Sequence, residues 1–527
     1  MHWSTKKAQE LIAKKKDVSA KFVCGAGISP SGNLHVGNFR DMATTLFVAK
    51  ALQKAGHETT VLLSFDELDR LRKIPQNVKN DLGKIFDELV GYPLSLCPDP
   101  YGCCESYGAH FKAPYIEALK AFNIKGLKFA HQKDLYLGGN YREQIKTAML
   151  RRLEICKMVD DKRTEKFTQA EREAFYPVKI ICSACGKLDT NITSFTSSNF
   201  TSEYTCECGF SGTFNFEADN HCKLAWKVDW PMRWAYENTD FEPGGKDHGS
   251  EQSSYNVSKV VSKQIYNFPA PDFIRYEFIG FGGVGKMSGS TGINMTPAEL
   301  LKIYTPELFL WLFARCEPQL AFTINILDEQ EVQRNYLEFD RAYQAYKAGT
   351  ADAKMATAVE LCLIEGRQFE PIPFNLIVTL GSIVDFNALL LVNLFKKIGI
   401  DVTAEALEDR LSRAKYWAEQ YVPQVIDKLL VTPDKEFFAS LTESEQQEIR
   451  DTAAILKTNP TTEELELALY GVTKKHVDNT DKKAMRNRQA QFFKNAYRLL
   501  IGKEQGPRLY MFLAACDTNK VIELLDL

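Results

Sequence analysis

The sequence lacks any long run of uncharged apolar residues. No stretch of about 18 such residues occurs among its 527 residues, so we expect no membrane-spanning helix and no membrane partner. The first residues, MHWSTKKAQELIAKKKD, are charged and have no apolar segment like that of a secretory signal, so we expect a cytoplasmic protein. An excess of positive charge is missing too. The net charge of −3 excludes a globally basic nucleic-acid binder but allows a local basic face.

Cysteine is present, but not in the pattern of a disulfide framework. The 13 cysteines are an odd number spread irregularly along a long chain, which indicates reduced thiols, some of which could bind a metal. With 45% hydrophobic and 25% charged residues, the composition is that of an ordinary globular protein. At roughly 100–200 residues per domain, the length predicts about three or four domains. We find no internal repeat and no low-complexity tract.

Residues 1–91 predict one half of a Rossmann-type α/β domain. KFVCGAGI (21–28) and ETTVLLSFDELD (58–69) have the composition of strands, and the segment between them has helical spacing. A strand, a glycine-rich loop, a helix and a second strand form a βαβ unit, which implies a parallel sheet. Such sheets bind ligands at the carboxyl ends of their strands. Residues 27–38 and 66–69 fall at such ends.

We expect the sheet to be interrupted and then completed. Residues 92–215 change to helices and a cysteine-bearing module, which we interpret as an inserted connective region. Residues 216–294 would supply the second half of the Rossmann-type domain. They contain the predicted strands CKLAWKVDW (222–230) and DFIRYEFIGF (272–281), with a predicted helix between them.

The rest of the chain is expected to be helical. TPAELLKIY (296–304) has Thr, Pro and Glu at the positions of a capping box, which is a strong helix start. Amphipathic periodicity continues from there towards the end of the chain. We divide this part into a helical connection at 295–345 and an all-α domain at 346–527.

Two loops rich in glycine and hydroxyl side chains have the composition of phosphate-binding loops. GISPSGNLHVGNFRD (27–41) follows the first strand, and its glycines let backbone N–H groups approach an anion at the start of a helix. By itself it fits a structural turn equally well. GVGKMSGSTG (283–292) follows the last strand and offers Lys286, Ser288 and Ser290 to a phosphate. Its alternative is a flexible surface loop.

The two loops together carry a family resemblance. HxGN near the N-terminus with KMSxS after the last strand resembles the class I aminoacyl-tRNA synthetases. Further motifs in the same order resemble the class I lysyl-tRNA synthetases: DELDRLRKIP, GCCESYGAHF, KVDWPMRWA, PGGKDHG and GPRL. This resemblance implies a lysine–tRNA ligase. Such an enzyme activates L-lysine with ATP to lysyl-adenylate and pyrophosphate, and then transfers lysine to the 3′-terminal ribose of tRNA(Lys).

The resemblance also implies which residues bind ATP. His35, Asn38 and Lys286 would stabilise charge on the phosphates as catalytic residues. Ser288, the fourth catalytic candidate, would hold the second loop on the nucleotide, which carries Mg²⁺. Asp247 matches an element that lies near the adenosine ribose. The full implied ATP site is Pro30, Gly32, His35, Gly37, Asn38, Gly245, Asp247, Lys286, Met287, Ser288 and Ser290.

The ammonium group of lysine needs a carboxylate or an aromatic cage when it leaves water. WKVDWPMRW offers both in one segment, which we interpret as a strand leading into a turn, and the resemblance places an acid at Asp41. Two alternatives stay open: Trp226 is a core residue, and Asp229 caps a helix or pairs with Arg233. The candidate lysine site is Gly27, Ser29, Asp41, Trp226, Asp229, Trp230 and His248.

Two cysteine pairs have the spacing of a metal site. CSAC (182–185) and CEC (206–208) resemble a zinc ribbon, in which four thiolates hold a tetrahedral Zn²⁺. We therefore expect a structural Zn²⁺ bound by Cys182, Cys185, Cys206 and Cys208. The alternative is four reduced surface thiols, which such close pairs in a small module make less favourable.

The C-terminal half offers a candidate RNA-facing segment. Residues 482–508 mix basic and aromatic side chains, which suits tRNA, although a solvated amphipathic helix is the alternative. By resemblance, 346–527 form an anticodon-binding domain. Three positions depart from the family pattern: Gly289 and Thr291 stand where lysine is common, and Cys104 stands where histidine is usual.

Four other functions compete with this hypothesis. A class I synthetase for glutamate would require an arginine where this sequence offers acids and tryptophans, and one for arginine would not be expected to carry KVDWPMRW and GKDHG together. A small-substrate nucleotidylyl transferase would not need about 200 further helical residues. A non-catalytic tRNA-binding paralogue would have lost the residues of the two loops, which are present here. We expect a monomeric enzyme.

Overall fold

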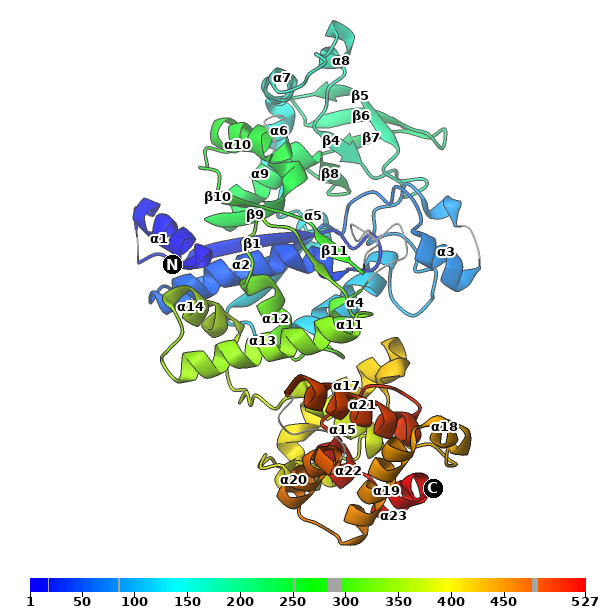
Figure 1. Cartoon of the computed structure of the whole chain (residues 1–527). Coiled ribbons are helices and arrows are strands. Elements are labelled where there is room, and N and C mark those ends of the chain that lie inside the picture. Colours follow the sequence, from blue (N-terminus) through cyan, green and yellow to red (C-terminus); the bar gives the residue numbers. More distant parts are fainter. Residues whose placement is uncertain (18, 84–85, 250–252, 283–294, 476–481) are drawn as a thin grey trace. The chain divides into compact units, whose positions relative to one another are not determined.

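The computed structural model describes residues 1–17, 19–83, 86–249, 253–282, 295–475 and 482–527. The chain divides into two compact units. The first comprises Met1–Leu301, Pro306–Ile324 and Ala345–Arg367, and the second comprises Lys302–Thr305, Asn325–Gln344 and Gln368–Leu527. In Figure 1 the first unit contains both strands and helices, whereas the described part of the second is helical.

The first unit is built on a parallel sheet of five strands. They are β1 (Phe22–Ile28), β2 (Thr59–Phe65), β3 (Leu127–His131), β9 (Phe241–Gly245) and β10 (Asp272–Tyr276). The strand order is β10-β9-β1-β2-β3, and every pairing is parallel. The order reverses between β1 and β9, so the carboxyl ends of these two strands form the switch point where such sheets bind ligands. The predicted Rossmann-type fold is confirmed.

Helix α2 (Val36–Lys54) connects β1 to β2 and shapes the first predicted loop. His35 precedes the helix, and its backbone N–H donates to Oδ1 of Asn38 at 3.0 Å, which fixes the first turn. Inside the fold, the Phe39 ring packs against Phe309 at 4.8 Å and Phe122 at 5.1 Å. The helix N-terminus is therefore held rigidly beside the end of β1.

The predicted strand at 222–230 is wrong beyond its first residues. Only β8 (Cys222–Leu224) is a strand, and Trp226–Glu237 form helix α9. In a strand, residues four apart are about 13 Å apart. In α9 they touch: the rings of Trp226 and Trp230 stack at a centroid distance of 5.0 Å. These side-chain contacts, which a strand could not make, favour the helix.

The sheet also extends into the predicted insertion at 92–215. Strand β3 lies within it, so the inserted module begins only after this strand. The residues of β3 are mostly exposed or half-buried, so the sequence contains no apolar run there that would have predicted the strand. The predicted strand at 272–281 divides into β10 and β11 (Ile279–Phe281), and β11 pairs with β12 (Phe322–Ile324) in a separate ribbon.

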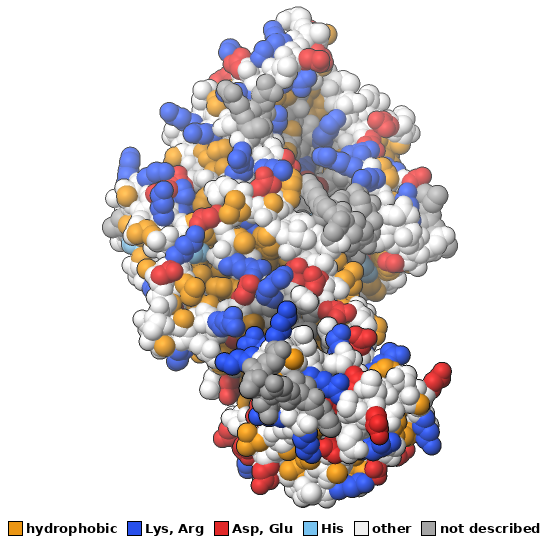
Figure 2. Space-filling model, viewed as in Figure 1, with side chains coloured by type: hydrophobic (Ala, Val, Ile, Leu, Met, Phe, Trp, Pro, Cys, Tyr) orange, Lys and Arg blue, Asp and Glu red, His pale blue; other side chains and the backbone are white. Residues whose placement is uncertain are grey.

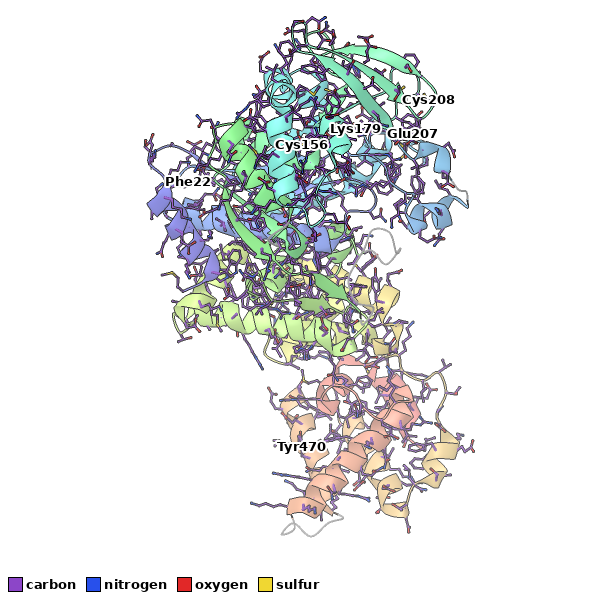
Figure 3. All side chains as sticks on the ribbon, turned by 90° about the horizontal axis from the view of Figure 1, so that it is seen from above. Phe22, Cys156, Lys179, Glu207, Cys208 and Tyr470 are labelled. Atoms are coloured by element: carbon purple, nitrogen blue, oxygen red, sulfur yellow. The ribbon has the colours of Figure 1, made fainter. Side chains whose placement is uncertain are left out.

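The inserted module carries the cysteine pairs. Strand β4 (Val178–Ile180) pairs antiparallel with β8. A second antiparallel sheet contains β5 (Thr190–Thr196), β6 (Thr201–Cys206) and β7 (Ser211–Asn215). Figure 3 labels Glu207 and Cys208, which lie in the turn between β6 and β7.

Further helices complete the first unit. They are α1 (Trp3–Lys14), α3 (Gln76–Leu82), α4 (Tyr107–Leu119), α5 (Gln132–Leu137), α6 (Arg142–Leu150), α7 (Arg152–Asp161), α8 (Gln169–Glu173), α10 (Ser254–Ile265), α11 (Pro297–Leu300), α12 (Pro306–Ala314) and α14 (Ala353–Cys362). The predicted helix start is confirmed, since Oγ1 of Thr296 accepts from the N–H of Glu299 at 3.2 Å. Lys50 in α2 donates to the carbonyl of Leu361 at 2.7 Å, which ties α14 to this unit. The units therefore do not divide at the predicted boundary of residue 346.

The second unit is a helical bundle. Its helices are α13 (Glu329–Lys347, mostly in this unit), α15 (Phe374–Ile383), α16 (Ala388–Lys397), α17 (Ala404–Tyr421), α18 (Lys435–Ser440), α19 (Glu443–Lys457), α20 (Thr462–Val472), α21 (Lys482–Ile501), α22 (Leu509–Ala515) and α23 (Thr518–Leu525). On the face shown in Figure 2, Lys and Arg side chains lie among Asp and Glu side chains. Across the described residues no single helix is long and apolar enough to cross a membrane; α15 and α16, bent by 115°, pass that test only as a pair.

Candidate active site and metal centres

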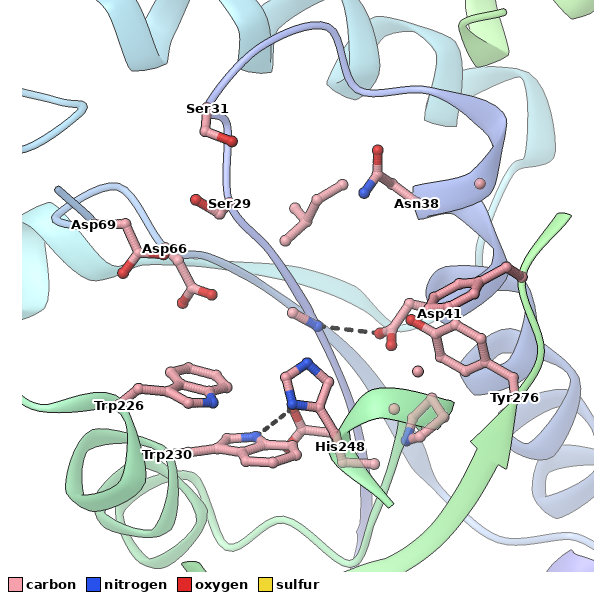
Figure 4. Close-up of a pocket in the computed structure, with 18 of the residues that line it drawn as sticks. Ser29, Ser31, Asn38, Asp41, Asp66, Asp69, Trp226, Trp230, His248 and Tyr276 are labelled. Carbon is pink, nitrogen blue, oxygen red and sulfur yellow. Dashed lines mark hydrogen bonds between the residues drawn. The ribbon is translucent and has the colours of Figure 1, made fainter. Parts of the chain in front are cut away.

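A cavity of about 570 Å³ opens at the carboxyl ends of β1, β2, β9 and β10. It lies at the switch point of the sheet, where a Rossmann-type fold binds its ligand. Figure 4 shows side chains from all four strand ends and from α2 and α9 facing this space. A second cavity of about 460 Å³ adjoins it and shares Ser29, His35, Asn38 and Asp69 among its lining residues.

The structure brings most of the predicted site residues to these cavities. Those that line the first cavity are Gly27, Ser29, His35, Gly37, Asn38, Asp41, Trp226, Trp230, Gly245 and His248. Gly32 lines the second cavity. Pro30, Asp229 and Asp247 line neither. Lys286, Met287, Ser288 and Ser290, with the departures Gly289 and Thr291, lie outside the described residues.

The N-terminus of α2 faces the first cavity. His35, Gly37 and Asn38 line it, and the helix dipole places a partial positive charge there. The N–H of Val36 donates to the carbonyl of Met295 and that of Asn38 to the carbonyl of His35, both at 2.8 Å. The hydrogen bond between the His35 backbone and Asn38 holds this turn in shape. An anionic group in the cavity would therefore meet the positive end of a helix dipole that is fixed in place.

Two carboxylates, the buried Asp41 and the half-buried Glu242, line the other side of the cavity. Asp41 accepts a hydrogen bond from the N–H of Gly27 at 3.2 Å. Glu242 accepts from the indole N–H of Trp230 at 2.9 Å and from that of Trp234 at 2.7 Å. Burial raises the pKa of Glu242 to about 7 despite these bonds. Burial, followed by the nearby Glu242 charge, raises the pKa of Asp41 well above its usual range.

Two neighbouring carboxyl groups whose ionisation is disfavoured in this way favour a cation as ligand. Two carboxylates that cannot both ionise easily will bind an ammonium group that restores their ionised forms. Sequence reasoning missed Glu242, which stands one residue before the quoted motif PGGKDHG. No strand was predicted at 241–245, so only the position of β9 in the structure brings Glu242 to the cavity.

Aromatic rings form the wall beside these carboxylates. The rings of Trp226 and Trp230 stack at a centroid distance of 5.0 Å with an angle of 18°. His248 meets Trp230 edge-on at 5.8 Å (Figure 4). A cation placed over an indole face gains further attraction from the ring. The alternative that Trp226 is a core residue does not hold, because this side chain lines the cavity.

Asp229 lies beneath the cavity in a buried ionic network. It pairs with Arg233, whose Nε lies 3.1 Å from Oδ1, and Oδ1 also accepts the hydroxyl of Tyr136 at 2.5 Å. Arg233 pairs in turn with Asp66, which lines the cavity. Burial raises the pKa of Asp66 to about 6, although Arg233 opposes this shift. The alternative reading of Asp229 as the partner of Arg233 is thus what the structure shows.

The rim of the cavity is tied to the inserted module. Asp69 pairs with Lys223 of β8. Arg70 donates to Asp189 at 2.6 Å, and the N–H of Leu188 donates to the carbonyl of Gly91 at 2.9 Å. The inserted module therefore contacts the segment after β2, in which Asp69 lines the cavity.

The four predicted cysteines form one cluster. The sulfur atoms of Cys182 and Cys208 are 3.8 Å apart, and those of Cys185 and Cys206 are 3.6 Å apart. All four lie within 4.8 Å of one another. A tetrahedral Zn²⁺ with Zn–S bonds of about 2.3 Å places its sulfur atoms about 3.8 Å apart. The donor set and its spacing therefore fit zinc.

A second cluster of potential ligands lies near α4. The ligand atoms of Asp99, Cys103, Cys104 and His110 also lie within 4.8 Å of one another. The sulfur of Cys103 is 3.2 Å from Nδ1 of His110, and the backbone N–H groups of Cys103 and Cys104 donate to Asp99. Sequence reasoning noticed Cys104 only as a departure from the family. The grouping of Asp, Cys, Cys and His within twelve residues was the missed signal.

Comparison with known proteins gives one family over the whole chain. The model of the family described as tRNA synthetases class I (K) matches residues 1–365. A lysine–tRNA ligase of Streptomyces coelicolor is 33% identical over 99% of this chain and 98% of its own length. Lysine–tRNA ligases of Pyrococcus horikoshii and Thermococcus kodakarensis are 30% and 31% identical, each over 100% of this chain and 99% of their own. The chain therefore belongs to the class I lysyl-tRNA synthetase family.

Proposed function

We propose that this class I aminoacyl-tRNA ligase activates L-lysine with ATP and transfers it to the 3′-terminal ribose of tRNA(Lys). The observation that carries this proposal is the cavity itself. It places a helix N-terminus suited to phosphate opposite buried carboxylates and tryptophans suited to an ammonium group. The family relationship supports the same reaction, and tRNA charging leads us to place the enzyme in the cytoplasm. We keep the expectation of a monomer as part of the proposal.

In the activation step, the lysine carboxylate attacks the α-phosphate of ATP and pyrophosphate leaves. The side chains of His35 and Asn38 lie where they can donate to the phosphate oxygens, and the positive end of the α2 dipole adds to the attraction. Gly245 lies at the end of β9 next to Asp247, a placement that suits the adenosine ribose. Mg²⁺ carried by the nucleotide would neutralise part of the phosphate charge. Lys286 and Ser288 remain proposed partners of the phosphates.

Lysine is proposed to extend its side chain between the carboxylates and the indole rings. Asp41 and Glu242 would pair with the ammonium group, while Trp226, Trp230 and His248 would enclose the rest. We assign Asp229 a positioning role instead of direct contact. It holds Arg233, which holds Asp66 at the edge of the cavity.

We also propose that both ligand clusters bind Zn²⁺. In each cluster four protein ligands would fill a tetrahedral coordination sphere, so the metal would stabilise the local fold and take no part in the reaction. Metal analysis of the purified protein should find two Zn²⁺ per chain. Cys208→Ser and Cys103→Ser should each remove one, and Cys156→Ser, which lies in neither cluster, should remove none. A metal-free protein of full stability would contradict this assignment.

We propose in addition that the helical second unit binds the anticodon of tRNA. Its basic helix α21 supports this assignment, because cations on an otherwise acidic chain offer a surface for RNA phosphates. The functional test is pyrophosphate exchange into ATP, measured with each amino acid in the presence of tRNA(Lys). Lysine alone should support exchange. Exchange with glutamate or arginine instead would indicate one of the rival synthetases, and no exchange would contradict the proposal.

A further inference from the structure

The second ligand cluster, the one near α4, is tied to the loop at 27–41 by one buried side chain. Tyr107 begins α4 and stands midway between Cys104 and His110 of the cluster. Its side chain is buried, and its hydroxyl donates to the backbone carbonyl of Ser31 at 3.0 Å. Ser31 lines both the first cavity and the one that adjoins it (Figure 4). The segment that carries the cluster therefore contacts the proposed ATP site directly.

The Tyr107 hydroxyl remains a hydrogen-bond donor in this environment. Burial raises the pKa of Tyr107 above its usual range, so the hydroxyl keeps its proton. The N–H of Ser31 bonds within the loop, to the carbonyl of Ser29 at 2.9 Å. The Tyr107 hydroxyl comes from another element, so it fixes where the loop lies relative to α4. A phenylalanine would fill the same space without supplying that donor.

The start of α4 is itself held in place. The side-chain oxygen of Ser106 caps the helix, and the N–H of Tyr107 donates to the carbonyl of Cys97 at 2.9 Å. The Tyr107 ring also belongs to a small buried core that includes Leu71, which lines the second cavity. The hydroxyl is therefore presented to Ser31 by a side chain whose own position is fixed.

A metal in the second cluster would fix this geometry from both sides. Cys104 precedes Tyr107 by three residues and His110 follows it by three, so two ligands of one ion would flank the side chain. Asp99 already orders this segment, because it accepts from the N–H groups of Cys103 at 3.0 Å and Cys104 at 2.9 Å. None of the four cluster residues lines either cavity. A metal there would act only on the position of the loop.

We propose that Tyr107 is a positioning residue for lysine activation and that the second cluster acts on the reaction through it. The hydroxyl holds Ser31, and with it the loop, where His35 and Asn38 can meet the ATP phosphates. Donors to a transition state are effective only while their positions are fixed, so a displaced loop should slow the reaction. This inference rests on the proposed function and adds to it a residue that contacts no substrate.

The first test is Tyr107→Phe, which keeps the ring and removes only the hydroxyl. In lysine-dependent pyrophosphate exchange with tRNA(Lys) present, kcat/KM for ATP should fall about 2- to 10-fold, the effect of one hydrogen bond. The Michaelis constant for lysine should not change, because the ammonium group is proposed to bind on the other side of the cavity. Metal analysis should find the same Zn²⁺ content as in the unchanged protein.

The matched control is Tyr101→Phe, in the same segment. The Tyr101 ring stacks on His110 at 4.2 Å, and its hydroxyl donates to Asp81 at 2.9 Å instead of to the loop. This variant should leave kcat/KM for ATP unchanged. Equal effects of the two substitutions, or a lysine constant that changes as much as kcat/KM for ATP, would overturn the positioning role. Loss of lysine-dependent exchange in the unchanged protein would instead count against the proposed function.

The second test determines whether the cluster acts through Tyr107. Cys103→Ser, which should lose one Zn²⁺, is expected to lower kcat/KM for ATP at least as much as Tyr107→Phe. The double variant should be no worse than Cys103→Ser alone, since both substitutions break the same connection. Hydrogen exchange in the peptide that contains Ser31 should be faster in all three variants. Multiplicative effects of the two substitutions, or unchanged hydrogen exchange, would contradict this coupling.

Discussion

The cavity at the sheet edge and the cavity in the helical unit differ in the balance and the exposure of their charges. The cavity at the sheet edge is lined by buried carboxylates, and burial raises the pKa of Glu242 to about 7. The cavity in the helical unit, about 460 Å³ in volume between α20, α21 and the segment 504–510, is lined by Glu466, Lys494, Glu504 and Arg508, all exposed or half-buried, and by aromatic rings. The net charge of −3 therefore says little about either site. Desolvated carboxylates suit a small cation, whereas exposed charges of both signs, such as the Lys494–Glu504 pair, favour neither sign of ligand.

The first prediction tests the proposed phosphate-binding side of the cavity at the carboxyl ends of the strands. His35→Ala should slow lysyl-adenylate formation by about 10²- to 10³-fold, because one preorganised donor to the transition state is lost. Lysine binding should change far less. Single-turnover kinetics with tRNA present measure both quantities. His57→Ala is the matched control, since His57 packs on Phe22 at the opposite end of the sheet. Equal losses of rate and lysine affinity would show that His35 is only structural.

The second prediction tests the proposed binding of the lysine ammonium group in the same cavity. Trp230 and Trp234 donate to different oxygens of Glu242, so Glu242→Gln keeps one acceptor, replaces the other with a donor and removes the carboxylate charge. The Michaelis constant for lysine should rise about 10- to 100-fold, the loss expected for a hydrogen bond to a charged group, while that for ATP stays constant. Glu277→Gln, whose carboxylate pairs with Lys246 at 3.0 Å, is the control. An unchanged Michaelis constant for lysine would show that Glu242 does not belong to the lysine site.

The third prediction concerns pH. Burial raises the pKa of Glu242 from 4.5 to about 7, and lysine binding requires the ionised form. The kcat/KM for lysine should therefore fall by up to tenfold per unit as the pH drops below about 7. Because the folded chain holds this proton more tightly than the unfolded chain, the contribution of Glu242 to stability is lost as pH rises from about 4.5 to 7. Both pH dependences should weaken in Glu242→Gln, and an unchanged profile would contradict this account.

The smallest expected effect lies in the contact between the inserted module and the cavity rim. Asp189→Asn weakens the ion pair with Arg70, whose neighbour Asp69 lines the cavity. Since partly exposed ion pairs contribute little, the Michaelis constant for lysine should rise only about 2- to 5-fold. Glu203→Gln, on the same module and away from the rim, should leave it unchanged. Identical values for the two variants would mean that the module does not position the rim.

Residues close together in the sequence were easier to predict than residues brought together by the fold. The βαβ unit, the loop at 27–41 and the four cysteines follow from local spacing, and the structure confirms that they form a sheet edge and a cluster. Glu242 and Asp41 are far apart in the chain, and only the pairing of β1 with β9 brings them to one cavity. No local pattern contains that information.

The misread segment at 222–230 shows a second limit. Its apolar and aromatic residues have high strand propensity, and its first three residues do form β8. Tertiary contacts decide the rest. Asp229 and Arg233 form a pair that helical spacing permits, and Arg233 also pairs with Asp66, which follows β2. Packing of this kind overrides local propensity, as a residue-by-residue reading cannot foresee.

The most direct test of the central claim compares lysine with 6-hydroxynorleucine, in which a neutral hydroxyl replaces the ammonium group. The claim is that Asp41, Glu242 and the tryptophans select the charge at this position. The measurement is kcat/KM for each substrate in tRNA(Lys) aminoacylation. We predict a preference for lysine of about 10⁴-fold, since a site built around a buried charged partner rejects an analogue that leaves it unpaired. Comparable values for the two substrates would contradict the account.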